Sequence, residues 1–344
     1  MKSIVTHVGL LLLASASAFT IWTREEKPEQ DKADTVEVWS GTPDGVEAVS
    51  FEGKQRSVKI QPKKDAIGRW YVVSMDKEIN APAPKAVPDA GAPPPAPPPK
   101  HELSTFLSMK AGDELMKKLA NLKALRSLGK LDAGKLVDYG LDKPEGTLKL
   151  KLGGKEQVLT IGAQTPGGSE RYAKYAASGE IFAIEGDLIQ SLSFADSRLT
   201  ERELHSFQSD EVKRVRVAKA EKARELARVA EKKDAWADAA TPSKPDESLV
   251  NWMTKVERLR ATEFVEKPSQ PLPANQAVVK LEYFSGNKSL GFLEVYKVTG
   301  EKGPEYLART EFTRWYVKLV ASSAEQVETD TGRVAQVTFG GRFG

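Results

Sequence analysis

Apolar residues form two helical stripes in widely separated parts of the chain. Successive members of each stripe lie four, three and three residues apart, so they occupy one face of an α-helix. The two stripes are Leu115, Leu119, Leu122 and Leu125, and Leu249, Met253, Val256 and Leu259. This pattern predicts two equivalent amphipathic helices, the first from about Gly112 to Ser127.

The same landmarks accompany both stripes in the same order. Each stripe follows a lysine-lysine-aspartate run with a nearby tryptophan, and it precedes an alternating apolar strand that ends in a turn. A tyrosine-bearing strand and a short acidic segment ending in arginine complete each set. The paired landmarks are Lys63–Asp65 with Trp70 and Lys232–Asp234 with Trp236, the turns Gly153-Gly154 and Ser285-Gly286-Asn287, Tyr172 and Tyr306, and 196–198 and 330–333. We interpret this order as the duplication of one unit.

The fold class expected from these patterns is α+β, with two tandem copies of a strand-rich unit. In each copy β-hairpins flank one amphipathic helix, and a short helix closes the copy. The expected strands of the first copy are 46–51, 57–60 and 70–73, and the expected closing helices are Asp187–Ser193 and Ser322–Val327. Val337 and Phe339 are expected to add a last edge strand.

One segment gives conflicting signals. Val212–Val217 alternates as a strand, but Ala218–Lys233 is rich in residues that favour helix. Val46 to Trp70 and Val212 to Trp236 nevertheless span the same number of residues, so we predict that this segment is a strand.

Residues 79–100 are rich in proline and alanine and lack apolar periodicity, so we expect an extended, solvated insertion inside the first copy. The second copy has only Thr241–Ser248 at the equivalent place. The predicted organisation is a membrane anchor or signal peptide at 1–24, a first repeat at 34–200, a second repeat at 208–334 and a tail at 335–344.

The apolar run from Ile4 to Trp22 addresses the chain to a membrane, and two interpretations are open. It is either an uncleaved anchor, with the remainder of the chain in the periplasm, or a signal peptide cleaved near Ala18. We favour the anchor, because Thr20, Ile21 and Trp22 extend the apolar run beyond the cleavage point.

Composition excludes several functions. The 51 basic and 48 acidic residues give a net charge of +3 without a basic stripe, so we expect no nucleic-acid partner. The absence of cysteine excludes disulfides, thiol nucleophiles and a lipoprotein anchor. A chain of 344 residues is long enough for two domains, which matches two copies.

No motif in the sequence assigns a catalytic, cofactor-binding or metal-binding residue. His7, His101 and His205 lie too far apart in sequence to suggest a ligand set. Ser285 and Lys288 match a Ser-x-x-Lys pattern, but they flank a hairpin turn rather than starting a helix. Gly162–Gly168 lacks the strand-to-helix context of a phosphate loop, so we expect no nucleotide. We expect Trp70 and Trp236 to be core residues rather than sugar-stacking platforms.

A family resemblance rests on a short signature. Tyr139-Gly140-Leu141-Asp142-Lys143-Pro144 is followed by an alternating strand, Ile161-Gly162, Thr165-Pro166 and the segment Asp196–Leu199. From about Val46 to Leu199 the chain resembles the bacterial envelope family of domain of unknown function 4340, although the second copy has Pro271-Leu272-Pro273 in place of the signature. In the signature itself, Gly140 suits a left-handed turn, Leu141 is expected to pack inward, and Pro144 prevents helix before the strand.

The resemblance implies a setting rather than a reaction. Members of the family typically have an N-terminal membrane segment, and their genes often lie beside those for ABC-type exporters and gliding-motility-like components. We therefore expect a non-enzymatic envelope accessory protein with partners in an inner-membrane transporter complex. The alternatives are a periplasmic glycan- or lipid-binding module that uses a groove between the repeats, and a hydrolase with unrecognised carboxylates.

Overall fold

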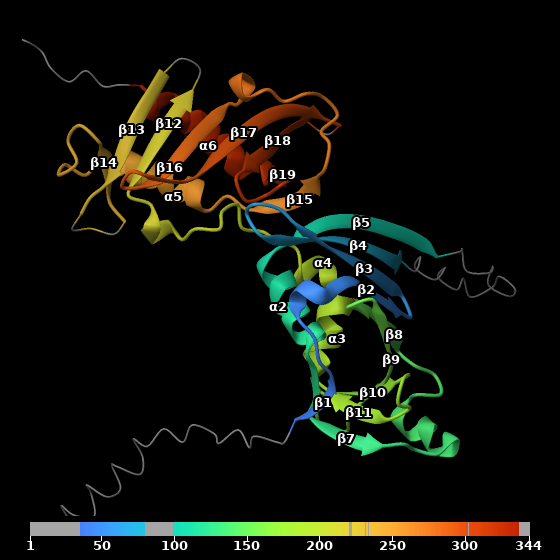
Figure 1. Ribbon diagram of the computed structural model, residues 1–344. Helices are drawn as coiled ribbons and strands as arrows, with labels where there is room; N and C mark the ends of the chain where they lie inside the picture. Colours follow the sequence, from blue (N-terminus) through green and yellow to red (C-terminus); the bar gives the residue numbers. More distant parts are fainter. Residues whose placement is uncertain are drawn as a thin grey trace, which may run out of the picture.

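The computed structural model describes residues 35–79, 99–219, 222–230, 232, 234–301 and 303–336. The apolar run Ile4–Trp22 and the expected edge strand at Val337 and Phe339 lie outside these residues. Within the described part of the chain, no helix has the length and apolar character needed to cross a bilayer. The described residues form two units, each built on one large antiparallel sheet (Figure 1).

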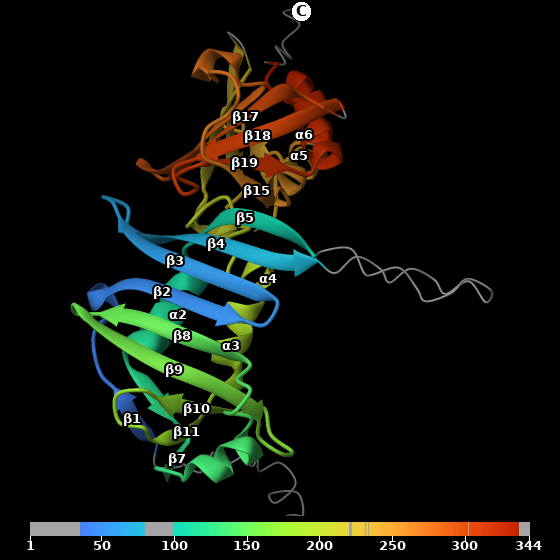
Figure 2. The same cartoon turned by 90° about the vertical axis from the view of Figure 1, so that its right-hand side faces the viewer.

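The first unit contains a nine-stranded sheet in the order β5-β4-β3-β2-β8-β9-β10-β11-β7 and a separate pair, β1-β6. Helices α2, α3 and α4 cover one face of the large sheet and lie behind it in Figure 2. The strands are β1 Val36–Trp39, β2 Val46–Gly53, β3 Arg56–Lys64, β4 Arg69–Ile79, β5 Lys100–Ser108, β6 Leu122–Ala124, β7 Arg126–Gly129, β8 Gly146–Leu152, β9 Lys155–Gln164, β10 Arg171–Tyr175 and β11 Ile181–Ile184. The helices are α2 Lys110–Ala120, α3 Gly186–Ser193 and α4 Ala195–Arg198.

The second unit contains an eight-stranded sheet in the order β14-β13-β12-β16-β17-β18-β19-β15. Helices α5 and α6 pack together against one face of it. The strands are β12 Arg214–Lys219, β13 Lys222–Arg228, β14 Trp236–Asp238, β15 Ala261–Val265, β16 Val279–Ser285, β17 Lys288–Gly300, β18 Gly303–Thr310 and β19 Tyr316–Leu319. The helices are α5 Glu247–Glu257 and α6 Ala321–Val334, and short 3-10 helices lie at Pro43–Gly45, Ala133–Tyr139, Ser209–Glu211 and Ala274–Gln276.

The two large sheets share one strand order. If β2, β3, β4 and β7 are matched with β12, β13, β14 and β15, and β8 to β11 with β16 to β19, every strand of the second sheet has a counterpart in the first. Strand β5 has no counterpart in the second sheet. The strand-rich α+β class expected from the sequence is therefore confirmed.

The alternating segments form the hairpins that the sequence predicts. Leu148, Leu150 and Leu152 of β8 are buried, and the turn at Gly153-Gly154 leads into β9. Tyr172 and Tyr306 lie in β10 and β18. Alternation places one set of side chains against the helices and the other on the opposite face of the sheet.

The signature around Gly140 has the structural roles expected from its sequence. Gly140 has the left-handed dihedral angles φ 65° and ψ 24°, and Leu141 is buried. Gly162 of β9 supports the same turn, because a Cβ atom there would lie 2.2 Å from the carbonyl oxygen of Tyr139. Close approach of the two backbones thus requires glycine at position 162.

The predicted helix from Gly112 to Ser127 is too long, because α2 ends at Ala120. Leu122 and Leu125 therefore lie beyond the helix; Leu122 is buried in β6, which pairs with β1. The indole Nε1 of Trp39 in β1 donates a 2.7 Å hydrogen bond to the carbonyl oxygen of Leu119, satisfying a carbonyl in the last helical turn. Strand pairing overrides the helical periodicity at this point.

The second stripe is also shorter than predicted, because α5 ends at Glu257 and leaves Leu259 buried just beyond it. The closing helix of the first unit, α3, matches the predicted Asp187–Ser193. Its counterpart α6 has 14 residues, so the prediction of a short helix at Ser322–Val327 is wrong in length.

The ambiguous segment after β12 is a strand, as the matched spacing predicts. β13 pairs with β12 on one side and with β14 on the other. Leu226 is fully buried opposite Val215, so burial in the middle of a sheet outweighs the helical propensity of the segment.

The insertion differs from the expectation at its ends. Ile79 is the last residue of β4 and Lys100 the first residue of β5, and these strands pair along their length. Residues 80–98 lie outside the described residues. The sequence reasoning missed β5, whose Phe106 and Leu107 are buried. The first unit therefore gains an extra strand at the edge of its sheet, next to the second unit.

Candidate functional site

The two units meet where β5 lies next to β15 (Figures 1 and 2). The segment between the units bonds to both of them. Glu201 N–H donates a 2.9 Å hydrogen bond to the carbonyl oxygen of Leu107 in β5, and Ala261 N–H of β15 donates a 3.0 Å bond to the carbonyl oxygen of Arg202. The segment therefore bridges the edges of the two sheets through backbone hydrogen bonds.

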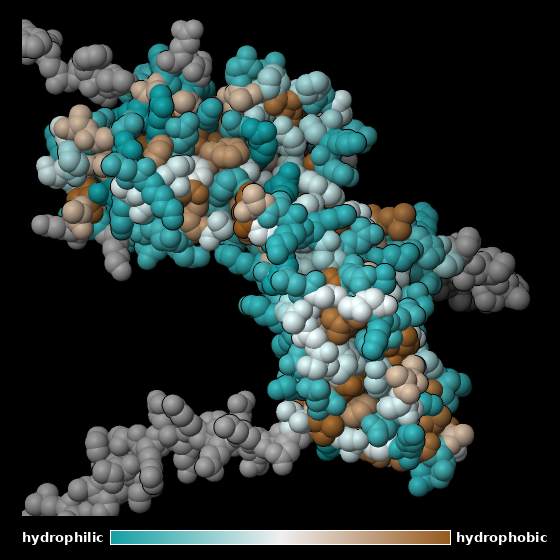
Figure 3. Space-filling view, viewed as in Figure 1, coloured by the Kyte–Doolittle hydropathy of each residue, from teal (hydrophilic) through white to brown (hydrophobic). Residues whose placement is uncertain are grey.

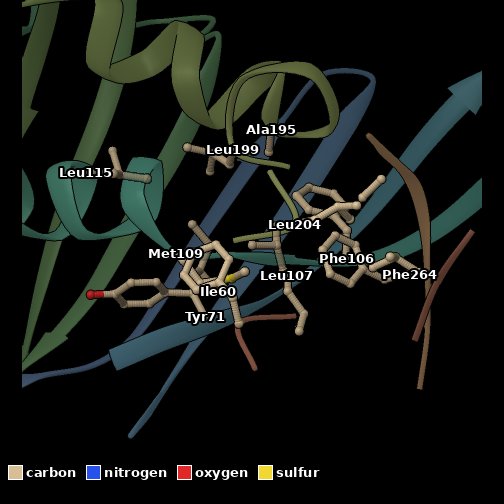
Figure 4. Packing of buried hydrophobic residues seen from close by; sticks show 14 of the residues in the cluster. Ile60, Tyr71, Phe106, Leu107, Met109, Leu115, Ala195, Leu199, Leu204 and Phe264 are labelled. Carbon is tan, nitrogen blue, oxygen red and sulfur yellow. The ribbon is translucent and has the colours of Figure 1, made fainter. Parts of the chain in front are cut away.

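Apolar side chains fill the junction. Figure 4 shows Phe106 of β5 next to Phe264 of β15, with Leu204 of the connecting segment close to them. All three side chains are buried. Burial of large apolar side chains from both units opposes their separation.

The Glu201 carboxylate connects the segment to the first unit. It is 9% exposed and accepts 3.1 Å hydrogen bonds from the backbone N–H groups of Arg202 and Glu203. Its other oxygen lies 3.5 Å from the backbone nitrogen of Lys110, the first residue of α2. A carboxylate at this position is favoured by the unsatisfied N–H groups and the dipole of the helix.

An ion pair joins two loops across the junction. Asp65 lies in the turn between β3 and β4, and Arg314 lies between β18 and β19. The Nε atom of Arg314 is 3.0 Å from Oδ2 of Asp65, and Nη2 is 3.2 Å from Oδ1. The Arg314 hydrogen bond is the main cause that holds the pKa of Asp65 below its ordinary value. Bidentate contact of this kind fixes direction as well as distance.

A cavity of ≈ 370 Å³ lies beside this junction, in the angle between the connecting segment, α5 and β16. This volume is at the lower end of the range for small-molecule sites. The cavity is lined by Lys110, Glu203, Leu204, His205, Phe207, Gln208, Ser209, Val212, Met253, Val256, Glu257, Leu259, Arg260 and Tyr283. Residues from both units and from the segment between them contribute to this junction cavity.

Three aromatic rings form one wall of the junction cavity. The ring centroid of His205 is 4.6 Å from that of Phe207 and 4.8 Å from that of Tyr283. The Nδ1 atom of His205 is 3.0 Å from a carboxylate oxygen of Glu311, which also accepts a bond from the backbone of Phe292. Since a carboxylate only accepts, Nδ1 is the donor, which fixes the orientation of the imidazole ring.

Tyr283 is 4% exposed, and burial raises the pKa of its hydroxyl. Among the described residues its hydroxyl has no hydrogen-bond partner. The phenol is neutral at physiological pH, and it can donate or accept a hydrogen bond at the cavity wall.

Polar residues surround the opening. Arg260 lies 3.4 Å from Glu203, and both side chains are about half exposed. Ser209 donates a 2.7 Å hydrogen bond to Glu257. Lys110 is exposed and has no ion-pair partner within the described part of the chain. The opening is therefore polar with one unpaired cation, and the floor is apolar.

The histidines that the sequence singled out are dispersed. His101 is 2.9 Å from Asp76 on the exposed β4–β5 ribbon, His205 lies at the junction cavity, and His7 is outside the described residues. No cluster of three or more histidine or acidic side chains that could hold a metal ion occurs among the residues described.

The rejected motifs lie where the sequence predicts them. Ser285 and Lys288 pair across the β16–β17 turn, and Gly162 lies within β9 with a strand rather than a helix after the following turn. Trp236 is buried under the guanidinium of Arg228, as expected for a core residue. Trp70 packs against the core but is only partly buried.

Sequence reasoning missed the junction cavity because its residues come from separate elements. The predicted repeats left 201–207 between them as an unassigned connection. Leu204, His205 and Phe207 within this short connection are the available signal, because apolar and aromatic residues are unusual in an exposed linker.

Comparison with protein families identifies the central part of the chain. The model described as Domain of unknown function (DUF4340) matches residues 110–277. This part of the chain therefore matches the family that the signature around Gly140 resembles. The match begins at α2 rather than near Val46, and it extends beyond Leu199 into the second unit. Except for Tyr283, every residue that lines the junction cavity lies within the DUF4340 match. No curated protein and no solved structure matches the chain.

Proposed function

We propose that this protein is a non-enzymatic accessory protein of the bacterial cell envelope. In this proposal the N-terminal segment holds the chain at the inner membrane, and both α+β units lie in the periplasm. There they serve an ABC-type export or motility-like membrane assembly. The DUF4340 match and the apolar run Ile4–Trp22 support this setting.

We also propose that the two units arose by duplication of one ancestral unit. The shared order of eight strands, reached through the same sequence of connections in both units, supports this origin. The proposed repeats are 34–200 and 208–334, and the insertion in the first repeat includes β5 as well as the proline-rich stretch.

The coupling of the two units is the main observation that supports a role in protein–protein interaction. Backbone bonds from 201–202, the Asp65–Arg314 ion pair and the packing of Phe106 on Phe264 join the units. In each unit the helices cover only one face of the sheet, and hydrophilic residues are spread over both units with apolar residues among them (Figure 3). A coupled pair of open sheets suits simultaneous contact with two parts of a larger assembly.

In-cell photo-crosslinking tests this proposal on both units. A photoreactive amino acid is placed at Lys59 in β3 or at Lys288 at the start of β17, both of which are exposed. We expect both positions of the full-length protein to form adducts with subunits of one membrane assembly. Absence of adducts from both positions, although the protein is present in the membrane fraction, would contradict the interaction role.

A second candidate function is the binding of a glycan or lipid at the junction. The junction cavity supports it, because the cavity lies between the two units and combines an apolar floor with a polar opening. Soluble peptidoglycan fragments and single-chain lipids are the probes that test this function. If neither protects residues 203–212 from hydrogen exchange in the full-length protein, this candidate is wrong.

A further inference from the structure

The floor and the opening of the junction cavity differ in chemistry. Leu204, Met253, Val256 and Leu259 are each at most 4% exposed and form the apolar part. The ring of Phe207 extends this surface beside His205. Such a floor favours an alkyl chain over a sugar, because a sugar ring needs hydrogen-bonding groups on most of its edges.

One polar group interrupts the apolar floor. The Tyr283 hydroxyl belongs to a side chain that is 4% exposed, and it has no hydrogen-bond partner among the described residues. Since Tyr283 lines the cavity, a bound molecule can reach this hydroxyl. A ligand that brings an oxygen atom to this wall can accept a hydrogen bond from it.

The charge at the opening favours an anion. Lys110 contributes an ammonium group without an ion-pair partner in the described residues, whereas Arg260 is already paired with Glu203. The N-terminus of α2 itself already has the Glu201 carboxylate as its partner, so the ammonium group of Lys110 is the cation that remains for a ligand. Glu257 also lies at the opening, but its carboxylate accepts the hydrogen bond from Ser209 and lies 3.6 Å from the guanidinium of Arg228. Gln208 and Ser209 are neutral.

From these contacts we infer that the junction cavity binds a single-chain amphiphile with an anionic head group. The alkyl chain lies on the floor formed by α5 and the connecting segment, and the head group contacts Lys110. The volume of ≈ 370 Å³ suits one chain rather than the two chains of a phospholipid. This inference rests on the second function proposed above and names its ligand class.

Photolabelling of the full-length protein in vesicles of zwitterionic lipid tests the inference. The probe is decanoate with a diazirine on its chain, and labelled peptides are identified by mass spectrometry. We expect saturable labelling within 203–212 and 249–260. Decanoate and a lysophosphatidylglycerol are the two competing anions, and they distinguish a free fatty acid from a membrane-derived lipid. Decanol is the uncharged competitor, because it has the same chain as decanoate without the negative charge.

Two substitutions locate the ligand. Lys110→Gln should weaken labelling by decanoate about fivefold, as expected for one exposed charged contact, without changing competition by decanol. Tyr283→Phe should weaken it about threefold through the lost hydrogen bond. Lys117→Gln is the matched control, because Lys117 is an exposed lysine of the same helix away from the junction cavity.

Three results would overturn the inference: labelling outside these peptides, equal effects of Lys110→Gln and Lys117→Gln, or equal competition by decanol and decanoate. If labelling fails while peptidoglycan fragments protect 203–212 from hydrogen exchange, the ligand class is wrong and the second function stands. If both fail, the second function fails as well.

Discussion

The Asp65–Arg314 ion pair gives the sharpest test of the coupling between the two units. Asp65 also accepts hydrogen bonds from the backbone of Ile67 and Gly68 within its own turn. Asp65→Asn keeps an oxygen atom for that turn but removes the charge that faces Arg314. The substitution therefore separates the contact between units from the local turn.

The magnitude follows from burial. Removing one partner of a fully buried pair costs about 3–5 kcal/mol, whereas a fully exposed pair contributes about 0.2–1 kcal/mol. The Arg314 side chain is 9% exposed and that of Asp65 is 33% exposed, so this pair lies between the two limits. We expect Asp65→Asn to lower the free energy of unfolding by about 1–3 kcal/mol.

The assay combines stability with the distance between units. Urea unfolding of Asp65→Asn, Arg314→Met and the double variant gives the coupling energy, with Asp138→Asn as control for a lost exposed carboxylate. Because the chain lacks cysteine, spin labels can be attached after Lys59→Cys and Lys288→Cys substitution. We expect the distance distribution between the labels to broaden in Asp65→Asn and to stay narrow in the control.

Additive effects of the two single substitutions would refute this reasoning, since they would show that the side chains do not interact. An unchanged distance distribution in Asp65→Asn would show that the pair does not orient the units.

Three further predictions concern acid stability and the first unit. Arg314 keeps the pKa of Asp65 below its ordinary value of 3.8, so the pair is stabilising above that pH and is lost as the pH falls through the lowered pKa. The stability difference between wild type and Asp65→Asn should thus be constant from about pH 5 to 8 and shrink below about pH 4 in urea unfolding; a constant difference at acid pH would contradict it. Trp39→Phe should lower the free energy of unfolding by about 1–2 kcal/mol in the same assay, because the carbonyl oxygen of Leu119 loses its buried hydrogen-bond donor. An unchanged midpoint of urea unfolding would contradict a stabilising role of this hydrogen bond. Gly162→Ala should lower the free energy of unfolding by about 2–3 kcal/mol, because the added methyl group clashes with the Tyr139 carbonyl oxygen. Hydrogen exchange at 139–141 should also become faster. Exchange at the wild-type rate there would show that the turn does not need glycine.

Repeated patterns predicted the elements whose structure depends on local sequence. The hairpin at Gly153-Gly154 and the left-handed Gly140 follow from turn chemistry and alternation. The strand β13 followed from matched spacing, although its own composition favours helix.

Other elements depend on contacts that a single sequence does not reveal. β5 was missed because its exposed half, Lys100–Ser104, has no alternation, and because Phe106 is buried next to Phe264 of the neighbouring unit. The length of α2 depends on pairing between β6 and β1, which are distant in the chain. The junction cavity was outside the reach of motif analysis, since the residues that line it come from four separate segments.

Purification of tagged full-length protein from membranes in mild detergent tests the central claim most directly. Mass spectrometry of the purified material identifies both the N-terminal residue of the protein and the proteins that co-purify with it. The account predicts an intact N-terminal segment and stoichiometric recovery of subunits of a membrane transporter or motility-like assembly. A chain that begins at Phe19 and is recovered alone would contradict the account.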